Sequence, residues 1–422
     1  MRKIQAVVLG YGNRGAAYSS YAAEHPEELE IVAVADPIEN RRAYAARLHT
    51  LPQERVFSDW REIAKQPKMA DFAIIATQDN MHLEPALAMI EKGYDLLLEK
   101  PMATTPAACK QITEAAEKKG VRVIVCHVLR FTPFWTTLKG IIDSGEIGTV
   151  MSINHMENVG NVHQSHSFVR GNWRRTEEST PMILAKCCHD TDLLQWLVGK
   201  PCKKVQSFGS LTHFTKENKP AGAPERCING CPHSDTCFYN AVRLYYEDKK
   251  NTWFRSVAAG TVDNPSDEAV LEALRTGPYG RCAYDCDNDV VDHQIVNMEF
   301  EGGATASLSM NAFNKGGRFI RVFGTKGEIT MGAGNWFDVY SFSDRKTKQV
   351  PIGAVGNTIA DGHGGGDTGI MIDTVNCLEK GIESPSICAV RMSYLGHLIA
   401  FAAEESRLTG MVVDLEEYAA RW

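Results

Sequence analysis

The sequence predicts an α/β protein of two domains: a doubly wound parallel sheet first, then an α+β domain with a mainly antiparallel open sheet. One observation is a glycine-rich turn between an apolar strand and an Ala-rich helix near the N-terminus. Another is a series of short, continuously apolar runs alternating with amphipathic stretches, which is typical of parallel strands buried on both faces. A third is the change, after residue 150, to strand-like segments separated by glycine turns. At 422 residues the chain suits two domains, which we place at 1–130 and 131–422.

The first element is the strand Ile4–Leu9, and the glycine turn follows it directly. Gly10 permits the tight turn, Gly12 lets the backbone approach a pyrophosphate, and Gly15 lets the next helix pack on the strand. The helix N-terminus would supply amide donors to the phosphates. A second strand, 30–35, ends in an acid at about the spacing of a ribose-binding carboxylate. The pattern predicts a Rossmann-like dinucleotide site formed by Gly10, Gly12, Asn13, Arg14, Gly15 and Asp36.

Asp36 also indicates which coenzyme is used. A carboxylate here can accept hydrogen bonds from both ribose hydroxyls but would repel a 2′-phosphate, so NAD is favoured over NADP. Arg41 and Arg42 leave the alternative open, because either guanidinium could neutralise a phosphate if it is not simply solvated on a helix that runs to Leu48.

The remaining elements follow in order. In the first domain, apolar runs predict strands at 71–76, 95–98 and 122–126, with helices at 81–91 and 105–119 between them. In the second domain the predicted strands are 150–157, 203–213, 295–300, 305–311, 319–323 and 328–331. Its clearest helices are 181–198, 367–379 and 394–407. Residues 217–287 are expected to form an irregular insertion.

Composition excludes several classes of function. The net charge is -7 and there is no long Lys/Arg run, so we expect no nucleic-acid partner. Only six largely apolar residues precede the glycine turn, too few for a secretory segment, and no stretch approaches a membrane span. We therefore expect a cytoplasmic protein without a membrane partner.

Five of the 12 cysteines cluster in the insertion, in the patterns C-x3-C-x5-C and C-x3-C. Thiolates of Cys227, Cys231, Cys237 and Cys286 could close a structural Zn²⁺ site, with Cys282 as the fifth member of the cluster. The spacings differ from the usual C-x2-C pairs, so free thiols or a redox-labile pair remain the alternatives. A metal is not expected in catalysis.

Glu99-Lys100-Pro101 follows the strand 95–98, at the sheet edge where doubly wound folds bind ligands, and 76–82 follows the neighbouring strand. With the glycine turn, these residues resemble the Gfo/Idh/MocA oxidoreductase family. The resemblance covers essentially the whole chain and implies that Lys100 lies beside the nicotinamide and the substrate hydroxyl. It also implies that a helix of the second domain supplies a histidine, here His189. The further coenzyme contacts expected at these edges are Thr77, Asn80, His82, Glu99 and Lys100.

The catalytic hypothesis rests on three residues. Lys186, His189 and Asp192 are three apart and could share one face of the helix 181–198. The family commonly places an Asp four residues before this histidine, whereas this chain has Ala185, so Asp192, Asp292 or His293 would have to orient the imidazole. We assign Lys100 to the alkoxide, His189 to acid/base catalysis, and Lys186 to a supporting role, since two nearby lysines lower each other's pKa.

The expected substrate residues are Arg130, Trp173, Arg174, Asp192 and His293. Donors beside an indole suit a polyol, whose hydroxyls need hydrogen bonds and whose ring needs an apolar face. The glycine-rich segment 362–367 could close over the cleft.

The favoured function is NAD-dependent oxidation or reduction of a secondary hydroxyl on a sugar, glycoside or cyclitol, with the substrate class supplied by the resemblance. Two alternatives stay open: NAD-assisted glycoside cleavage through transient C3 oxidation and elimination, and a non-catalytic sugar or dinucleotide sensor. Family habit suggests a homo-oligomer, a dimer or tetramer joined through the open face of the second sheet.

Overall fold

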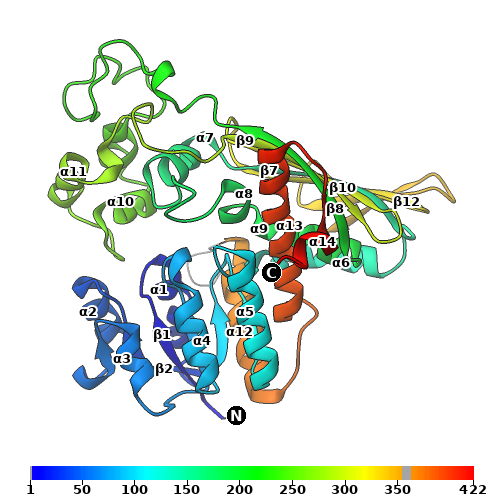
Figure 1. Ribbon diagram of the computed structural model, residues 1–422, viewed down its shortest axis with the longest axis horizontal. Coiled ribbons are helices and arrows are strands. Elements are labelled where there is room, and N and C mark those ends of the chain that lie inside the picture. The colour runs from blue at the N-terminus through cyan, green and yellow to red at the C-terminus, as the bar shows by residue number, and fades with distance from the viewer. Residues whose placement is uncertain (1, 354–362) are drawn as a thin grey trace.

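The computed structural model describes residues 2–353 and 363–422. Two sheets organise the chain, as Figure 1 shows: a helix-flanked sheet at the N-terminal end, and a large second sheet that extends away from it. The insertion forms a separate lobe over the N-terminal domain on the left of that view. No described helix combines the length and the apolar character that a membrane crossing requires.

The first sheet is parallel throughout and has the order β3-β2-β1-β4-β5-β6, which confirms the predicted doubly wound fold. Its strands are β1 Ile4–Leu9, β2 Leu29–Ala35, β3 Val56–Phe57, β4 Phe72–Ile75, β5 Asp95–Leu98 and β6 Val123–Val125. The helices between them are α1 Asn13–Glu24, α2 Glu39–Leu48, α3 Trp60–Lys65, α4 Leu83–Glu91 and α5 Pro106–Lys119. The strands β1, β4 and β5 are almost wholly buried, because helices cover both faces of the sheet.

Nine strands form the second sheet, in the order β14-β13-β12-β11-β7-β10-β9-β8-β15. They are β7 Val150–Asn158, β8 Cys202–Ser210, β9 His293–Phe300, β10 Thr305–Asn311, β11 Gly317–Gly324, β12 Gly327–Met331, β13 Trp336–Ser341, β14 Thr347–Pro351 and β15 Val413–Asp414. Among the described strands of this second sheet only β7 and β10 pair in parallel, so the sheet is mainly antiparallel, as predicted. One face is covered by helices, and apolar side chains such as Phe208 and Ile295 are exposed on the other.

The helices of the second half are α6 Pro133–Asp143, α7 Asn161–His163, α8 Met182–Ala185, α9 Cys188–Val198, α10 Thr252–Ala259, α11 Asp267–Thr276, α12 Gly366–Lys380, α13 Val390–Thr409 and α14 Leu415–Ala419. The segments Gln164–Arg170 and Val242–Glu247 are π-helical. Short 3₁₀ turns occur at Gln53–Arg55, Asp79–Met81, Val128–Phe131, Lys216–Asn218 and Pro278–Gly280.

The single helix predicted over 181–198 was wrong. It is broken between α8 and α9, because Cys187, with φ -97° and ψ 7°, leaves the helical range and caps the second helix. Residues 186, 189 and 192 therefore do not lie on one continuous helix.

The insertion was also predicted wrongly as irregular. It contains α10 and α11, whose N-termini are capped by the side chains of Asn251 and Ser266 respectively. The two helices bury Phe254 and Leu274 in a small core of the insertion's own. The two helices have eight and ten residues, too few to show a sustained apolar period in the sequence.

Helix α12 returns the chain to the first sheet. Its residues Ile370, Met371 and Val375 pack into the same apolar cluster as Ile4 and Tyr18. A helix near the C-terminus thus completes the layer that holds the glycine turn.

Candidate active site

The three glycines of the first turn differ in the space around them. Gly10 has φ +89°, and a Cβ there would lie 2.5 Å from the carbonyl oxygen of Ala76. A Cβ on Gly15 would lie 2.0 Å from the carbonyl oxygen of Gly10. A Cβ on Gly12 would meet only the Arg41 guanidinium, at 3.5 Å. The backbone at Gly10 and Gly15 is therefore crowded by the protein itself, whereas Gly12 faces open space.

Helix α1 begins at this turn with no side chain capping its first amides. Asn13 is exposed at its first position. Uncapped N-terminal amides beside an uncrowded glycine are the arrangement that accommodates a pyrophosphate, so the residues present fit a dinucleotide.

Asp36 is buried at the end of β2. Its carboxylate accepts hydrogen bonds from the backbone amides of Tyr11 (2.7 Å) and Ile38 (2.8 Å). Arg41 approaches the same carboxylate at 3.8 Å, and Arg42 donates to the Asp36 carbonyl oxygen at 2.6 Å. Both arginine side chains thus contact Asp36 rather than extending freely into solvent.

Arg14 and Glu99 form a partly buried ion network beneath the turn. Arg14 donates to Glu99 at 2.7 Å and, through two nitrogens, to Asp367 of α12 at 2.7 and 2.9 Å. The Tyr18 hydroxyl donates to the same Glu99 oxygen at 2.7 Å. Burial alone would raise the pKa of Glu99, but the Arg14 guanidinium holds it below its usual value. These side chains fasten α1, the end of β5 and α12 together.

His82 connects the two loops at the carboxyl edge of the sheet. Its ring nitrogens face the carbonyl oxygens of Pro101 (2.8 Å) and Thr77 (3.2 Å), and the ring is buried. Asn80 is exposed on the short 3₁₀ turn between Thr77 and His82. His82 therefore positions the loop that carries Lys100.

Lys100 reaches from that loop to the second domain. Its Nζ donates to the carbonyl oxygen of Ala185, at the end of α8, over 3.0 Å. His189 follows in the first turn of α9 and is only 5% exposed, with its Nδ1 buried and unpartnered. Burial lowers the pKa of His189 well below 6.5, and the nearby Lys100 lowers it further. The imidazole is therefore neutral at physiological pH.

A buried ion network lies behind these two residues. Lys186 contacts Glu157 at 3.4 Å, and Arg318 contacts Glu157 and Asp190 at 2.7 Å each. The Nε2 atom of His155 is hydrogen-bonded to the same Asp190 carboxylate at 2.7 Å. Glu157, Asp190 and Arg318 were missed by the sequence analysis, although the buried alternate positions 155 and 157 of β7 are a detectable signal of polar side chains directed inward.

Asp192 and Arg130 face each other instead of the cleft. Two hydrogen bonds of 2.7 and 2.6 Å join them, and both side chains are almost wholly buried. The Arg130 guanidinium stacks over Trp196 at 5.1 Å, and His127 lies 3.7 Å from Asp192. This cluster binds the end of the first domain to α9.

The predicted substrate loop makes mainly internal contacts. The Trp173 indole donates to Asp79 at 2.8 Å, and Arg174 pairs with Asp287 of the insertion at 2.8 Å. His293 lies at the start of β9, 2.8 Å from Asp292, and its side chain is 44% exposed. With Phe208 and Ile295 it lines a shallow depression on the open sheet face.

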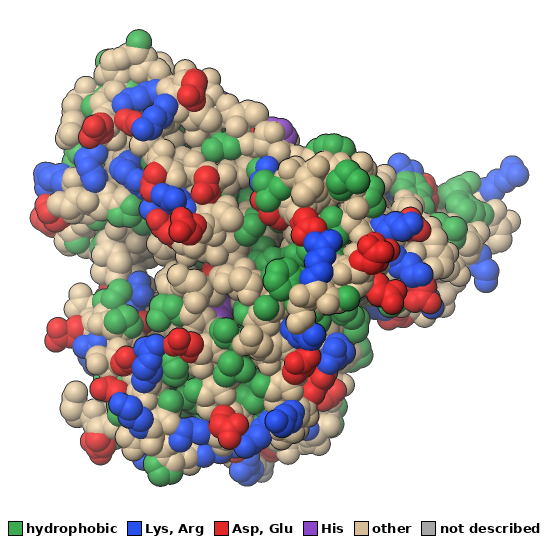
Figure 2. Space-filling view, viewed as in Figure 1, with side chains coloured by type: hydrophobic (Ala, Val, Ile, Leu, Met, Phe, Trp, Pro, Cys, Tyr) green, Lys and Arg blue, Asp and Glu red, His purple; other side chains and the backbone are tan. Residues whose placement is uncertain are grey.

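Two ring-bearing side chains that sequence reasoning did not assign, His163 and Trp253, lie beside each other in the second half of the chain. Burial lowers the pKa of His163 well below 6.5, and the positive charges of Lys186 and Lys100 lower it further. The Trp253 ring of α10 stands 5.6 Å from that ring. On the other side, the ring of His363 lies 6.1 Å from His189. Figure 2 shows the surface hollowed between the N-terminal domain and the insertion.

His363 also pairs with Asp367 at 3.1 Å. It belongs to the segment expected to close over the cleft, of which Gly362 lies outside the described residues.

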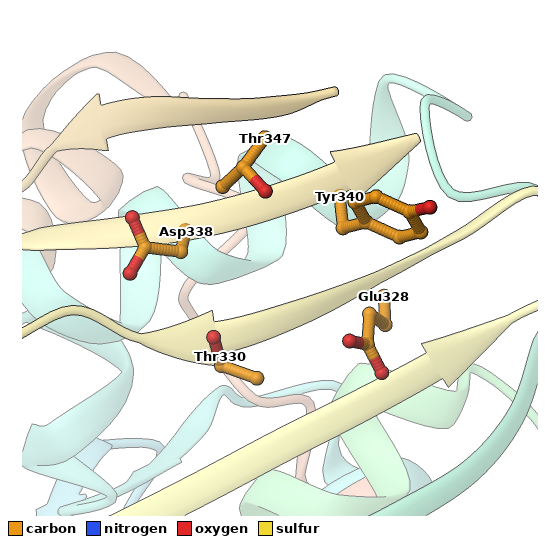
Figure 3. A pocket seen from close by; sticks show the side chains of 5 residues that line it. All are labelled: Glu328, Thr330, Asp338, Tyr340 and Thr347. Carbon is orange, nitrogen blue, oxygen red and sulfur yellow. The ribbon is translucent and has the colours of Figure 1, made fainter. Parts of the chain in front are cut away.

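A second hollow lies elsewhere, on the open face of the large sheet. Figure 3 shows its lining, which comes from β12, β13 and β14: Glu328, Thr330, Asp338, Tyr340 and Thr347. It contains none of the residues gathered around Lys100 and is a shallow groove between neighbouring strands.

All 12 cysteines are free thiols. Among the described residues, the groups that bring three ligand atoms within 4.8 Å of one another are His127, Asp192 and Cys388, and His25, Glu27 and Glu28. Neither includes a cysteine of the insertion.

Comparison with known proteins agrees with this fold. The oxidoreductase family described as having an NAD-binding Rossmann fold matches residues 4–127, and its C-terminal alpha/beta domain matches residues 139–361. The chain therefore belongs to the Gfo/Idh/MocA family of oxidoreductases, as its motifs indicated.

Its relatives within the family are distant. The oxidoreductase named YteT of Bacillus subtilis is 27% identical over 76% of this chain and 74% of its own length. An inositol 2-dehydrogenase of Salmonella typhimurium is 27% identical over 49% of this chain and 57% of its own length. A levoglucosan dehydrogenase solved with NADH and L-sorbose shares the fold, with a TM-score of 0.71 and 21% identity over 98% of this chain and 99% of that one.

Proposed function

We propose that this protein is an NAD-dependent oxidoreductase that acts on a secondary hydroxyl of a sugar, glycoside or cyclitol. The observation that carries the proposal is the meeting of Lys100 and His189 at the carboxyl edge of the parallel sheet. Lys100 comes from the N-terminal domain and His189 from the second, and Lys100 is held against the carbonyl oxygen that ends α8. Ligands of doubly wound sheets bind at this edge.

The coenzyme would be held by the glycine turn and Asp36. The uncapped amides of α1 would receive the pyrophosphate, and the Asp36 carboxylate would accept a ribose hydroxyl. That carboxylate supports NAD over NADP, although Arg41 stands 3.8 Å away. When bound, the nicotinamide supplies hydride transfer.

The chain's own residues supply proton transfer and charge. His189, neutral at physiological pH, would accept the hydroxyl proton as the alcohol is oxidised and return it in the reverse direction. The Lys100 Nζ would donate to the substrate oxygen and stabilise its developing negative charge. The ring of His363, whose side chain is 38% exposed, lies 6.1 Å from the His189 ring and would carry the proton out.

No described side chain pairs with His189 Nδ1 in place of the Asp that position 185 lacks. His189 Nδ1 has no partner, so the imidazole is oriented by packing alone, with His127 at a ring distance of 6.0 Å. The acids of this region, Glu157 and Asp190, neutralise Lys186 and Arg318 instead. We therefore infer that the Lys186 ammonium group lines the substrate pocket as a positive charge, which Glu157 balances.

The substrate class is supported by the cleft's lining and by the relatives. Trp253 offers an aromatic face, while His163 and the two lysines offer polar groups to hydroxyls. Two of the similar proteins are named for inositol and levoglucosan, both polyhydroxylated rings.

The test is a screen of inositols, free sugars and aryl glycosides with purified protein and NAD, following both NADH absorbance and released aglycone. Net NADH formation, reduced at least about a hundredfold by Lys100→Ala with NAD binding retained, supports the proposal. Aglycone release without net NADH would replace it by redox-assisted glycoside cleavage. Sugar binding with neither reaction would indicate a sensor.

We also propose a homo-oligomer joined through the open sheet face, where Phe208 is 54% exposed and Ile295 40%. Phe208→Asp should shift the molecular mass measured by light scattering to that of a monomer. An unchanged mass would exclude this face.

A further inference from the structure

His363 and Asp367 form a histidine–carboxylate pair where the chain enters α12. The Nδ1 atom of His363 lies 3.1 and 3.3 Å from the two carboxylate oxygens of Asp367. The Asp367 side chain is only 7% exposed, whereas that of His363 is 38% exposed. A carboxylate beside Nδ1 keeps the ring proton on that nitrogen and leaves Nε2 bare. The pair therefore fixes which nitrogen of His363 can accept a proton.

The backbone holds His363 in this place. Its φ is +54°, a left-handed conformation that a residue with a side chain adopts only where the surrounding contacts require it. The start of α12 behind it packs closely on the 3₁₀ turn 128–131, since a Cβ on Gly366 would lie 2.3 Å from the Val128 carbonyl oxygen. The position of His363 is thus set by the fold.

Asp367 is also bound to Arg14 of the glycine turn. Two nitrogens of Arg14 donate to the two oxygens of Asp367, at 2.7 and 2.9 Å. Burial alone would raise the pKa of Asp367, but the hydrogen bonds from His363 and Arg14 hold it below its usual value. The carboxylate is therefore ionised at neutral pH, and it can balance a positive charge on the His363 ring.

Arg14 connects this pair to the loop of Lys100. Its Nε donates to Glu99 at 2.7 Å, and the other Glu99 oxygen accepts the backbone amide of Lys100 at 2.6 Å. An unbroken series of hydrogen bonds therefore links the loop of Lys100 to the ring of His363.

His363 also lies next to the proposed base. Its ring centroid is 6.1 Å from that of His189, with the two ring planes at 51°. One water molecule can carry a proton between two nitrogens across such a gap. Because His189 is only 5% exposed, a proton that it takes up needs a more exposed group through which to reach solvent.

We propose that Asp367 is a positioning residue for proton release: it holds His363 with Nε2 ready to receive the proton that His189 removes from the substrate, and Arg14 fixes Asp367 in turn. This role rests on the proposed function, in which His189 is the base. The same hydrogen bonds tie the proton exit to the loop that presents Lys100 to the substrate oxygen.

The proton moves in three steps. The O–H bond of the substrate breaks and its proton bonds to a ring nitrogen of His189, while the electron pair stays on oxygen for the forming carbonyl group. The proton then passes to His363 Nε2, which returns His189 to its neutral form and leaves an imidazolium beside the Asp367 carboxylate. Release from Nε2 to a base in the solvent restores the starting state, and reduction uses the same steps in reverse.

Rescue by an added base tests this role in the full-length protein, with NAD and whichever screened polyol it oxidises. His363→Ala should lower kcat at least about tenfold, with KM and the Kd for NADH changed less than about threefold, and added imidazole should restore most of kcat. Asp367→Asn keeps the shape of the side chain and leaves Arg14 paired with Glu99. It should show a smaller loss of kcat that imidazole also restores.

His25→Ala is the matched control. The His25 side chain is 34% exposed and its Nδ1 lies 3.9 Å from a Glu27 oxygen, but it stands at the far end of α1 from the glycine turn. Its kcat should match that of the wild type with and without imidazole.

A loss of kcat in His363→Ala that imidazole does not restore would show a purely structural role and overturn the proposal, as would wild-type kcat in that variant. If Asp367→Asn fails to fold, Asp367→Glu, which retains the charge, replaces it and should keep kcat within about threefold of the wild type. A wild-type protein that oxidises none of the screened compounds would refute the proposed function itself, whereas an active wild type with unaffected variants would refute only the role of this pair.

Discussion

Gly12 and Gly10 stand two residues apart in the same turn, yet substitution by alanine should have opposite consequences at the two positions. At Gly12 the backbone has φ -76° and ψ -162°, which alanine adopts without strain, and a new methyl group would meet only the flexible Arg41 side chain at 3.5 Å. At Gly10 the φ of +89° disfavours alanine, and the methyl group would stand 2.5 Å from a backbone oxygen.

The magnitudes follow from these surroundings. Gly12→Ala should leave the free energy of unfolding unchanged or raise it by up to about 1 kcal/mol, since alanine restricts the unfolded chain. Gly10→Ala should cost about 1–3 kcal/mol from backbone strain, and more from displacing the Ala76 carbonyl. If the pyrophosphate approaches the backbone at Gly12, the methyl group of the Gly12→Ala variant should raise the Kd for NADH at least tenfold, or about 1.4 kcal/mol.

The assay is urea unfolding followed by fluorescence, combined with calorimetric titration of NADH into each folded variant. The expected result is a Gly12→Ala protein that is as stable as the wild type but binds coenzyme poorly. A Gly12→Ala variant that binds NADH as tightly as the wild type would refute the assignment of this turn to the pyrophosphate.

Three further predictions concern charge and substrate. Asp192→Asn should lower the free energy of unfolding by about 3–5 kcal/mol, because it leaves Arg130 as a buried unpaired charge. Asp287→Asn, which breaks part-exposed ion pairs with Arg174 and Arg281, should cost at most about 1 kcal/mol for each pair, and equal thermal shifts in the two variants would contradict this. Burial lowers the pKa of His127 to about 4, against about 6.5 in an unfolded chain, so the unfolded state binds the proton more readily in this window. Stability should therefore be fully present above pH 6.5 and fall as the pH drops toward 4, by up to about 1.4 kcal/mol per pH unit for this histidine, and a flat urea-unfolding profile from pH 6.5 to 5 would exclude it. Trp253→Ala should raise KM for a sugar substrate at least about fivefold with the Kd for NADH unchanged, and an unaltered KM would remove the indole from the substrate site.

The sequence predicted the nucleotide-binding half well, because its signals are local. Glycines at fixed spacing, a buried strand before them and an acid at the end of the next strand all act within 36 residues of the N-terminus. The strand β3 was missed because it has only two residues, Val56 and Phe57, too few to form an apolar run.

The second half of the site was less predictable, because its contacts join distant segments. Arg130 and Asp192 both looked suited to a polar substrate, and nothing in the local pattern shows that they satisfy each other. The rings of Trp253 and His163 lie 5.6 Å apart, although the two residues are far apart in the sequence. The break before α9 was hidden as well, since residues 181–198 contain no glycine or proline between the first residue and the end of the helix.

The most direct measurement is a crystal structure of the protein with NAD and a competent or inhibitory polyol. The proposal predicts the nicotinamide ring at the carboxyl edge of the first sheet, with a substrate oxygen within hydrogen-bond distance of both Lys100 Nζ and a ring nitrogen of His189. A coenzyme bound elsewhere, or a polyol whose oxygens contact neither side chain, would contradict it.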